Sequence, residues 1–376
     1  MLDRQAGEVT EITAQTVQIQ KVVVRLADGS EVGAICFGDL VGWCQVGDRV
    51  VLNRTARSLN LGSGGWDFVM AIVDRTELQK QPSGQLGHGH LIKLRYTPAQ
   101  MAVLAWDEEA SPVRPRDPAS YGDLDDTPVL IAGVHSLVEP IVRGLAVLAE
   151  GCKIAYIHTD AACLPAAWSQ VIALLKAEGL LTTVISSGHS FGGDYEALNN
   201  YSALACAKEV VKADFILACM GPGIPGTGTK YGSTAIEVGE LINAVAALNG
   251  RPLAVPRLSF ADRRSRHYGI SHHFITALEV AAFAPAQITF PFYREEEHAI
   301  LQQLAELSGL TRPNRNGVLH ELVFCNVTEL TDRLKPHLDS FSSMGRSFSE
   351  DPLHFAAGLA AAQTAVSVGP IAPSIL

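Results

Sequence analysis

Three polar segments within residues 181–273 decide the fold, because each follows a short apolar run of strand length. They read Gly188-His189-Ser190-Phe191-Gly192-Gly193-Asp194, then Gly221-Pro222-Gly223-Ile224-Pro225-Gly226-Thr227-Gly228-Thr229-Lys230, then Phe260-Ala261-Asp262 through His267 to His272-His273. If the apolar runs are parallel strands, all three segments lie at the carboxyl ends of those strands, where open α/β sheets bind ligands. The pattern locates a candidate site without naming a reaction.

Around these segments, residues 127–376 alternate between apolar runs and stretches of helical period. Strands are predicted at 129–134, 153–157, 182–185, 214–219, 253–258, 287–292 and 321–325. This alternation predicts a Rossmann-like α/β domain, in which a doubly wound, mostly parallel sheet is covered by helices on both faces. Two C-terminal helices are expected at 328–340 and 351–366. The second is rich in alanine and suits either internal packing or a dimer seam.

The first 75 residues have the alternating pattern of a small all-β barrel, of the SH3-like or OB-like kind. Asp28-Gly29 separates two of the alternating runs and predicts a hairpin turn. Residues 76–126 are interpreted as a linker with a short strand at 90–96 and a short helix that opens at Thr97-Pro98. Small barrels often bind nucleic acid or oligosaccharide, but aromatic residues are sparse here, which favours a structural or interdomain role.

Composition narrows the class of protein. Hydrophobic residues make up 47% of the 376 residues and charged residues 18%, which is typical of a compact globular chain. The net charge of -10 disfavours nucleic acid as a partner, since binding to it normally needs a basic face. No apolar run has the length of a membrane span and no signal-peptide pattern is visible, so a cytoplasmic location is expected, with no membrane partner. The seven cysteines include no C-x-x-C pair and suit buried free thiols.

The first polar segment fits the G-x-S-x-G nucleophile elbow of serine hydrolases, with Ser190 as the nucleophile. Asp262 and His272 follow in the required order as acid and base. Against this interpretation, no upstream oxyanion loop is visible, and Asp194 stands where small apolar residues normally pack. The other interpretation is a glycine-rich strand-to-helix turn in which Asp194 caps the helix.

The second segment, residues 221–230, is called the glycine loop below. Its candidate anion-binding residues are Gly223, Gly226, Thr227, Gly228, Thr229 and Lys230. The loop matches G-x-G-x-x-G, but Pro222 and Pro225 remove two amide donors and no acidic residue ends the next strand, so the match to a dinucleotide fingerprint is poor. Closely spaced amides, two hydroxyls, a lysine and a following helix N-terminus suit phosphate or carboxylate. The alternative is a purely structural crossover loop.

The third segment places arginines and histidines after a strand. Ser271 is predicted to be the N-cap of a helix whose first turn holds His272 and His273, where the helix dipole disfavours their protonation. Neutral imidazoles there can serve as a base or as metal ligands. With His189 and Asp194 they would form a mixed nitrogen and oxygen metal set. The neighbouring arginines are candidates for binding phosphate.

Two further polar loops fall at predicted strand ends. They contain His135 and His158-Thr159-Asp160, and they bring the number of such loops to five. A single histidine at a strand end is usually structural, but five polar loops on one edge indicate a ligand site.

Four blocks of the sequence together resemble a bacterial family catalogued as domain of unknown function 3866. They are residues 188–194 with Glu196-Ala197, residues 220–239, residues 259–273, and Gly345-Arg346-Ser347 with Glu350-Asp351-Pro352. The resemblance covers nearly the full length of the chain. It implies the two-part layout, it implies that alanine is common at the position of Ser190, and it implies no activity.

These observations predict a small-molecule enzyme of transferase or hydrolase type that binds a phosphorylated or otherwise anionic ligand at the carboxyl edge of the sheet. The catalytic candidates are His189, Asp194, Asp262 and His272, and the glycine loop is expected to bind the anion. The alternatives are a non-catalytic ligand-binding or sensory protein, and a serine hydrolase that uses Ser190. The sequence assigns no cofactor and no metal, and it allows a homodimer.

Overall fold

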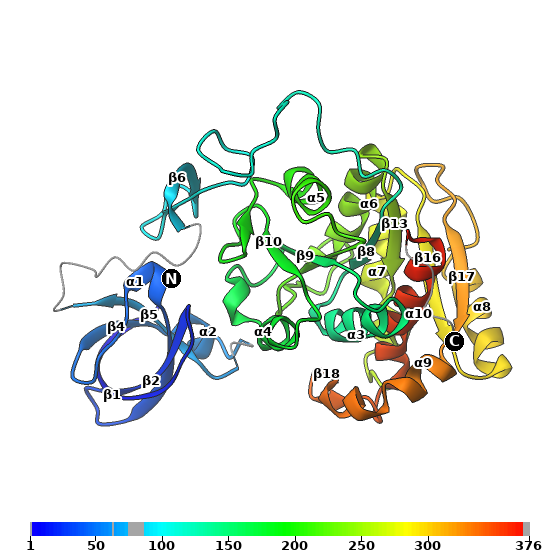
Figure 1. Ribbon diagram of the computed structural model, residues 1–376. Helices are drawn as coiled ribbons and strands as arrows, with labels where there is room; N and C mark the ends of the chain where they lie inside the picture. The colour runs from blue at the N-terminus through cyan, green and yellow to red at the C-terminus, as the bar shows by residue number, and fades with distance from the viewer. Residues whose placement is uncertain (1, 62–63, 74–85, 371–376) are drawn as a thin grey trace. The chain divides into compact units, whose positions relative to one another are not determined.

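The computed structural model describes residues 2–61, 64–73 and 86–370 (Figure 1). The chain divides into two compact units, Met1–Leu104 and Ala105–Leu376. This division falls inside the segment 76–126 that the sequence suggests as a linker. Among the described residues, no helix combines the length and the apolar character that crossing a bilayer requires.

The first unit contains a closed five-stranded barrel, as the alternating pattern predicts. Its strands are β1 (Arg4–Gln15), β2 (Ile19–Leu26), β3 (Glu31–Phe37), β4 (Arg49–Asn53) and β5 (Asp67–Ile72), in the order β1-β2-β3-β5-β4. The hairpin predicted at Asp28-Gly29 joins β2 to β3, and Gly29 adopts a φ of 83° there. Inward-facing aliphatic residues fill the barrel, among them Val22, Val50 and Leu52.

Shorter elements complete this unit. The helices α1 (Gly38–Val41) and α2 (Thr55–Ser58) connect barrel strands, and β6 (Leu86–Lys93) pairs with β7 (Met101–Val103). The prediction of a short helix opening at Thr97-Pro98 is wrong, because these residues form turns. The Thr97 hydroxyl donates a hydrogen bond to the Leu94 carbonyl oxygen at 2.8 Å, a local bond that competes with helix formation.

In the second unit, eight parallel strands form one sheet. They are β8 (Pro128–Ala132), β9 (Ile154–Thr159), β10 (Thr183–Ser186), β11 (Tyr195–Glu196), β12 (Phe215–Met220), β13 (Arg251–Val255), β16 (Gln287–Phe292) and β17 (Glu321–Asn326). Their order is β11-β10-β9-β12-β8-β13-β16-β17. All seven predicted strands are present, and every residue of the central strands β8, β9 and β12 is buried, as expected for a parallel sheet covered on both faces.

The strand order reverses around β8. From β8 the chain moves to one side through β9, β10 and β11, returns as β12 between β9 and β8, and continues on the other side through β13, β16 and β17. Ligands of open α/β sheets bind outside the carboxyl ends of the strands at such a reversal. The loops after β12 and β13, which flank β8, therefore have the favoured position.

Helices cover both faces of this sheet (Figure 1). One layer holds α3 (Val138–Leu148), α4 (Gln170–Ala177) and α10 (Pro352–Val368), and the other holds α5 (Asn200–Glu209), α6 (Glu237–Ala247) and α7 (His272–Thr276). The helices α8 (Glu295–Leu307) and α9 (Thr328–Arg333) complete the unit. α10 packs closely on α3, since a Cβ on Gly144 would lie 2.8 Å from the Ala362 Cβ. The alanine-rich face of α10 is thus an internal packing surface.

Candidate functional site

Five polar loops follow neighbouring strands at the carboxyl edge of the sheet. The strands are β10, β9, β12, β8 and β13, which are adjacent in this order. The prediction that these loops share one edge is therefore confirmed. Their side chains fall into two groups that differ in hydrogen bonding.

The histidines after β8 and within β9 are held by hydrogen bonds. His135 Nδ1 lies 3.1 Å from the Met220 carbonyl oxygen, and His135 Nε2 lies 2.7 Å from the Ser169 hydroxyl. His158 is buried, with its Nε2 2.8 Å from the Cys163 carbonyl oxygen. Burial lowers the pKa of His135 to about 4, so this ring is neutral at pH 7. Both histidines serve to hold the loops at the strand ends.

The segment after β10 does not form a nucleophile elbow. Ser190 is completely buried, and its Oγ lies 2.6 Å from the His158 carbonyl oxygen and 2.8 Å from the Ser187 carbonyl oxygen. The chain next forms β11, and α5 begins only at Asn200. A serine nucleophile needs an exposed hydroxyl on a direct strand-to-helix turn, so this geometry does not support a serine hydrolase.

The prediction that Asp194 caps a helix is wrong. The N-cap residue of α5 is Asn199, whose side chain accepts a hydrogen bond from the Ser202 N–H. Asp194 instead pairs with Lys176 in α4 and accepts a hydrogen bond from the Val184 N–H at 2.8 Å. Because β11 follows Asp194 directly, its carboxylate ties the loop to α4 and β10.

The predicted metal set of His189 and Asp194 with His272 and His273 does not occur among the described residues. The backbone N–H of His189 donates to the Asp160 carboxylate at 2.8 Å, which fixes the loop after β10 to the loop after β9. His189 and Asp194 therefore belong to the group of locally bonded residues, and the structure does not gather them with the other catalytic candidates.

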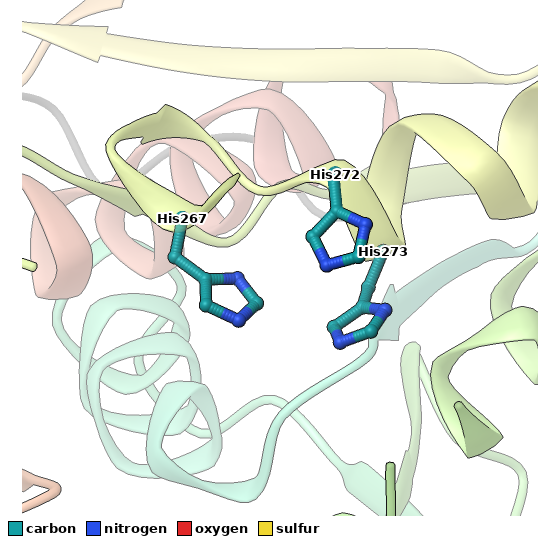
Figure 2. Close-up of side chains that lie close together, drawn as sticks. All are labelled: His267, His272 and His273. Atoms are coloured by element: carbon teal, nitrogen blue, oxygen red, sulfur yellow. The ribbon is translucent and has the colours of Figure 1, made fainter. Parts of the chain in front are cut away.

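Three histidines come together after β13. His267 belongs to a 3₁₀ turn (Ser265–His267), and His272 and His273 open α7 directly after Ser271, as the sequence predicts (Figure 2). The ring centroid of His267 lies 5.1 Å from each of the other two centroids, which are 3.9 Å apart. One nitrogen of each ring lies within 4.8 Å of a nitrogen on both others. We call these three residues the histidine cluster.

All three imidazoles of the histidine cluster have lowered pKa values. The pKa is about 3 for His267 and about 4 for His273, and it is also lowered for His272. Burial is the main cause in each case, and the positive charge of Arg257 adds to it. Arg266 contributes as well for His272 and His273. The rings are neutral, as predicted, but the cause is burial beside arginines rather than the helix dipole alone.

Three buried nitrogens at this place have no hydrogen-bond partner among the described residues. They are His272 Nε2, His273 Nδ1 and Arg257 Nη1. Buried polar groups in folded proteins are nearly always paired. Unpaired nitrogens on neighbouring side chains therefore make this place a candidate ligand site.

Asp262 organises the arginines of this region. Its buried carboxylate pairs with Arg257 and Arg264, each at 2.8 Å, and Arg346 lies 3.9 Å away. Hydrogen bonds from Arg264 and then Arg257 hold the pKa of Asp262 far below its usual range. A carboxylate stabilised in this way is a poor proton acceptor. Its contacts make Asp262 an anchor for guanidinium groups and weaken its candidacy for acid–base work.

The same network carries excess positive charge. It contains four arginines and three carboxylates, namely Arg257, Arg264, Arg266, Arg346, Asp262, Asp351 and Glu350. Arg346 pairs with Asp351 at 3.1 Å, whereas Arg266 makes no ion pair with any described residue. One positive charge is thus left over at one point of a chain whose net charge is -10. Such a local excess attracts anions.

The glycine loop lies beside the histidine cluster and Arg266. A Cβ on Gly228 would be 3.4 Å from Arg266 Nη1, and a Cβ on Gly226 would be 3.9 Å from His273 Nε2. Gly228 has a φ of +78°, a conformation that favours glycine. Residues 223–230 are exposed. Two of the three segments singled out in the sequence therefore converge, and their meeting point is open to solvent on the loop side.

The other candidate anion-binding residues of the glycine loop differ in the contacts that they already make within the chain. The Thr227 and Thr229 hydroxyls lie 3.0 Å apart and bond to each other. Lys230 Nζ lies 5.6 Å from the centroid of the Tyr231 ring. A 3₁₀ turn (Thr234–Ile236) follows the loop and leads into α6, and the Ser233 hydroxyl at its start accepts a hydrogen bond from the Ala235 N–H. The expectation that this helix N-terminus adds to the anion site stays a prediction.

Glu237 is itself a candidate that sequence reasoning missed. It accepts a hydrogen bond from the Thr159 hydroxyl at 2.7 Å, and burial raises its pKa to about 7. A carboxyl group with a pKa near neutrality at the carboxyl edge of a parallel sheet is suited to proton transfer. Its only signal in the sequence was membership of the block 220–239 that carries the family resemblance, since the raised pKa comes from burial in the folded chain.

Arg257, Arg346 and Asp351 were also missed. Arg346, in the strand β19 (Arg346–Ser347), lies 3.9 Å from Asp262. Asp351, directly before α10, pairs with Arg346 at 3.1 Å and so joins the network from far along the chain. The only signal for Arg346 and Asp351 was membership of a sequence block that carries the family resemblance, and Arg257 lies outside these blocks.

Comparison with known proteins identifies a family whose description names no activity. A family model described as Protein of unknown function (DUF3866) matches residues 33–362. The chain belongs to this family. The resemblance seen in the sequence is confirmed, and the description of the family assigns no reaction. No curated protein and no solved structure matches the chain.

Proposed function

We propose that the chain is a small-molecule enzyme of hydrolase or transferase type, whose phosphorylated or otherwise anionic substrate binds between the glycine loop and the arginines after β13. The proposal is carried by the approach of Gly228 to Arg266, because it joins an exposed glycine turn, an arginine and the histidine cluster at one place. Arginine recognises phosphate and carboxylate through paired, charge-assisted hydrogen bonds.

Two guanidinium groups have donors to offer an anion. Arg266 makes no ion pair with a described residue, and Arg257 keeps Nη1 unpaired while its Nη2 donates to Asp262 at 2.8 Å. Asp262 fixes the orientation of Arg257. A ligand that meets an oriented donor does not have to order it, which favours tight binding.

The unpaired nitrogens of the histidine cluster would supply the chemistry. Neutral imidazole lone pairs either accept a proton from an attacking hydroxyl group or bind a metal ion. His272, with its unpaired Nε2, is the catalytic candidate that the geometry favours. His189, Asp194 and Asp262 have local partners that favour structural roles.

The binding test uses the full-length protein in the presence of a chelator. ATP, glucose 6-phosphate and pyrophosphate are titrated by calorimetry, with adenosine and glucose as unphosphorylated controls. We expect the phosphorylated class to bind, and we expect Arg266→Ala to weaken binding at least tenfold, the scale of a lost charge-assisted hydrogen bond of about 1.5–3 kcal/mol. The matched control is Arg312→Ala, which removes an exposed arginine from the connection that enters β17 at the opposite edge of the sheet.

Turnover separates an enzyme from a non-catalytic binding protein. Any compound that binds is incubated with the protein and its conversion is followed by phosphate release and by chromatography. His272→Gln is expected to abolish conversion while leaving binding within about threefold of wild type. Equal affinity for phosphorylated and unphosphorylated compounds, or wild-type affinity in Arg266→Ala, would contradict the anion site. Binding without conversion of any compound would contradict the enzyme and favour a sensory protein.

A further inference from the structure

We propose that His267, His272 and His273 bind a divalent transition-metal ion of the zinc class. The three rings project into one common space (Figure 2), and one nitrogen of each lies within 4.8 Å of a nitrogen on both others. Only one part of this inference rests on the proposed function, namely that the metal lies beside the bound anion. The three-histidine geometry stands independently of it.

The nitrogens need to approach one another only slightly. Zinc binds imidazole nitrogen at about 2.0–2.1 Å, and a tetrahedral arrangement then separates two such nitrogens by about 3.4 Å. Small rotations of the rings bring nitrogens that are up to 4.8 Å apart to this spacing. His272 and His273 are half-buried, so their side chains have room to make this adjustment.

Lone pairs are available on all three rings. His272 Nε2 and His273 Nδ1 are buried and have no partner among the described residues. His267 Nδ1 lies 2.9 Å from the Ser271 hydroxyl. When Nδ1–H donates to that hydroxyl, the lone pair of His267 is on Nε2, and this nitrogen can bind a metal. Ser271 is almost completely buried, so its hydroxyl acts as a positioning group for His267.

The type of ligand selects the metal. Three neutral imidazoles suit zinc, copper, nickel or iron(II), whereas magnesium and calcium prefer oxygen ligands. Three protein ligands leave a fourth position for water or a substrate oxygen, which is typical of catalytic rather than structural zinc sites. Arg257 and Arg266 oppose a bound cation by charge repulsion. We therefore expect an anion and the metal to strengthen each other's binding.

The experiment measures metal binding by the intact chain without any anionic ligand. Chelator-treated protein in a phosphate-free buffer is titrated with zinc by calorimetry, and with cobalt(II) by visible absorption. We expect one zinc ion per chain and the intense visible bands of tetrahedral cobalt. His272→Gln and His273→Gln are each expected to weaken zinc binding by about 100-fold or more, since loss of a ligand costs at least as much as loss of an outer partner.

Control variants separate this site from other metal-binding groups. His337→Gln removes an exposed histidine of the segment Lys335–Ser340 and should bind zinc like wild type. Ser271→Ala should weaken zinc binding about tenfold, and Ser271→Thr, which retains a hydroxyl, should restore it. Thermal melting of each variant shows whether it is folded. The cobalt spectrum of the wild-type protein tests the site even if His272→Gln or His273→Gln does not fold.

Three results would overturn the proposal. They are the absence of a stoichiometric zinc ion, wild-type affinity in both His272→Gln and His273→Gln, and a cobalt spectrum with the charge-transfer band of cysteine thiolates. Because the anion titrations contain a chelator and the zinc titration contains no anion, the two ideas fail separately. Loss of the metal site with anion binding intact leaves the proposed function standing.

Discussion

His135 and His273 lie at the same edge of one sheet, and burial lowers the pKa of each to about 4, yet their surroundings differ. Both ring nitrogens of His135 have partners, the Met220 carbonyl oxygen and the Ser169 hydroxyl. His273 has a buried Nδ1 with no partner among the described residues. The two histidines therefore share a lowered pKa with the same main cause and differ in whether their ring nitrogens have hydrogen-bond partners.

The comparison extends to two regions of the edge. The satisfied edge follows β8, β9 and β10, and its polar groups, such as those of His135 and Ser190, bond to backbone oxygens and hydroxyls. The open edge follows β12 and β13, where the glycine loop meets the histidine cluster and Arg266. One region uses its polar groups to hold the chain, and the other has buried nitrogens without hydrogen-bond partners among the described residues.

The largest expected effect separates the two histidines by stability. His135→Ala leaves a cavity and removes partners from the Met220 carbonyl oxygen and the Ser169 hydroxyl, so we expect it to lower the free energy of unfolding by about 3 kcal/mol. His273→Ala removes no hydrogen bond of Nδ1 and should cost less than about 1 kcal/mol. Urea unfolding at pH 7.5 measures both values. An equal loss of unfolding free energy in the two variants would contradict the distinction between the two edges.

Glu237 belongs to both edges. It is the first residue of α6, which follows the glycine loop in the chain, and it accepts a hydrogen bond from Thr159 at the end of β9. Its pKa is about 7 in the folded chain against an ordinary value of 4.5, so the folded chain binds more protons between these pH values and loses stability as pH rises through them. Glu237→Gln removes this loss. We expect the variant to be more stable than wild type by up to about 3 kcal/mol at pH 8 and nearly equal to it at pH 4.5.

Urea unfolding of both proteins across this pH range provides the measurement. A constant difference between Glu237→Gln and wild type from pH 4.5 to pH 8 would show that the carboxyl group titrates normally. Glu237 would then lose its place as an acid–base candidate.

A smaller effect is expected at Ser190. Ser190→Ala removes a buried hydroxyl that donates to backbone carbonyl oxygens, and it should lower stability by about 1 kcal/mol. Anion affinity and any conversion should stay at the wild-type level, because Ser190 belongs to the satisfied edge. Calorimetric titration and the conversion assay check this together. Loss of conversion with unchanged binding would restore the serine hydrolase.

The smallest effect is expected at Lys230. Its exposed ammonium group lies near the Tyr231 ring, where solvent screens its charge. Lys230→Ala should therefore weaken anion binding by less than about tenfold and leave the urea midpoint unchanged. A stronger loss than that caused by Arg266→Ala would move the centre of the anion site from the arginines to the loop.

The sheet was predictable because buried parallel strands are continuous apolar runs, as in β8, β9 and β12. β11 was missed because a two-residue strand has no such run. Its presence also explains the error at Asp194, since the sequence suggested a helix directly after the loop. Tertiary pairing of a short segment with β10 leaves no local pattern in the sequence.

The candidate site was predictable in part. The glycine loop and the histidines stood out by residue type, and strand order placed them on one edge. Arg346 and Asp351 come close to these segments because α10 packs against the sheet. The spacing of residues in the sequence does not reveal this packing. The raised pKa of Glu237 and the unpaired nitrogens of His272 and His273 depend on burial in the folded chain.

The most direct test of the two edges is an NMR spectrum of the side-chain nitrogens of the twelve histidines, recorded before and after addition of zinc and pyrophosphate. Signals are assigned with single His→Gln variants of the full-length chain. We predict that the resonances of His267, His272 and His273 shift while those of His135 and His158 stay in place. Shifts at His135 or His158, or no shift in the histidine cluster, would contradict the account.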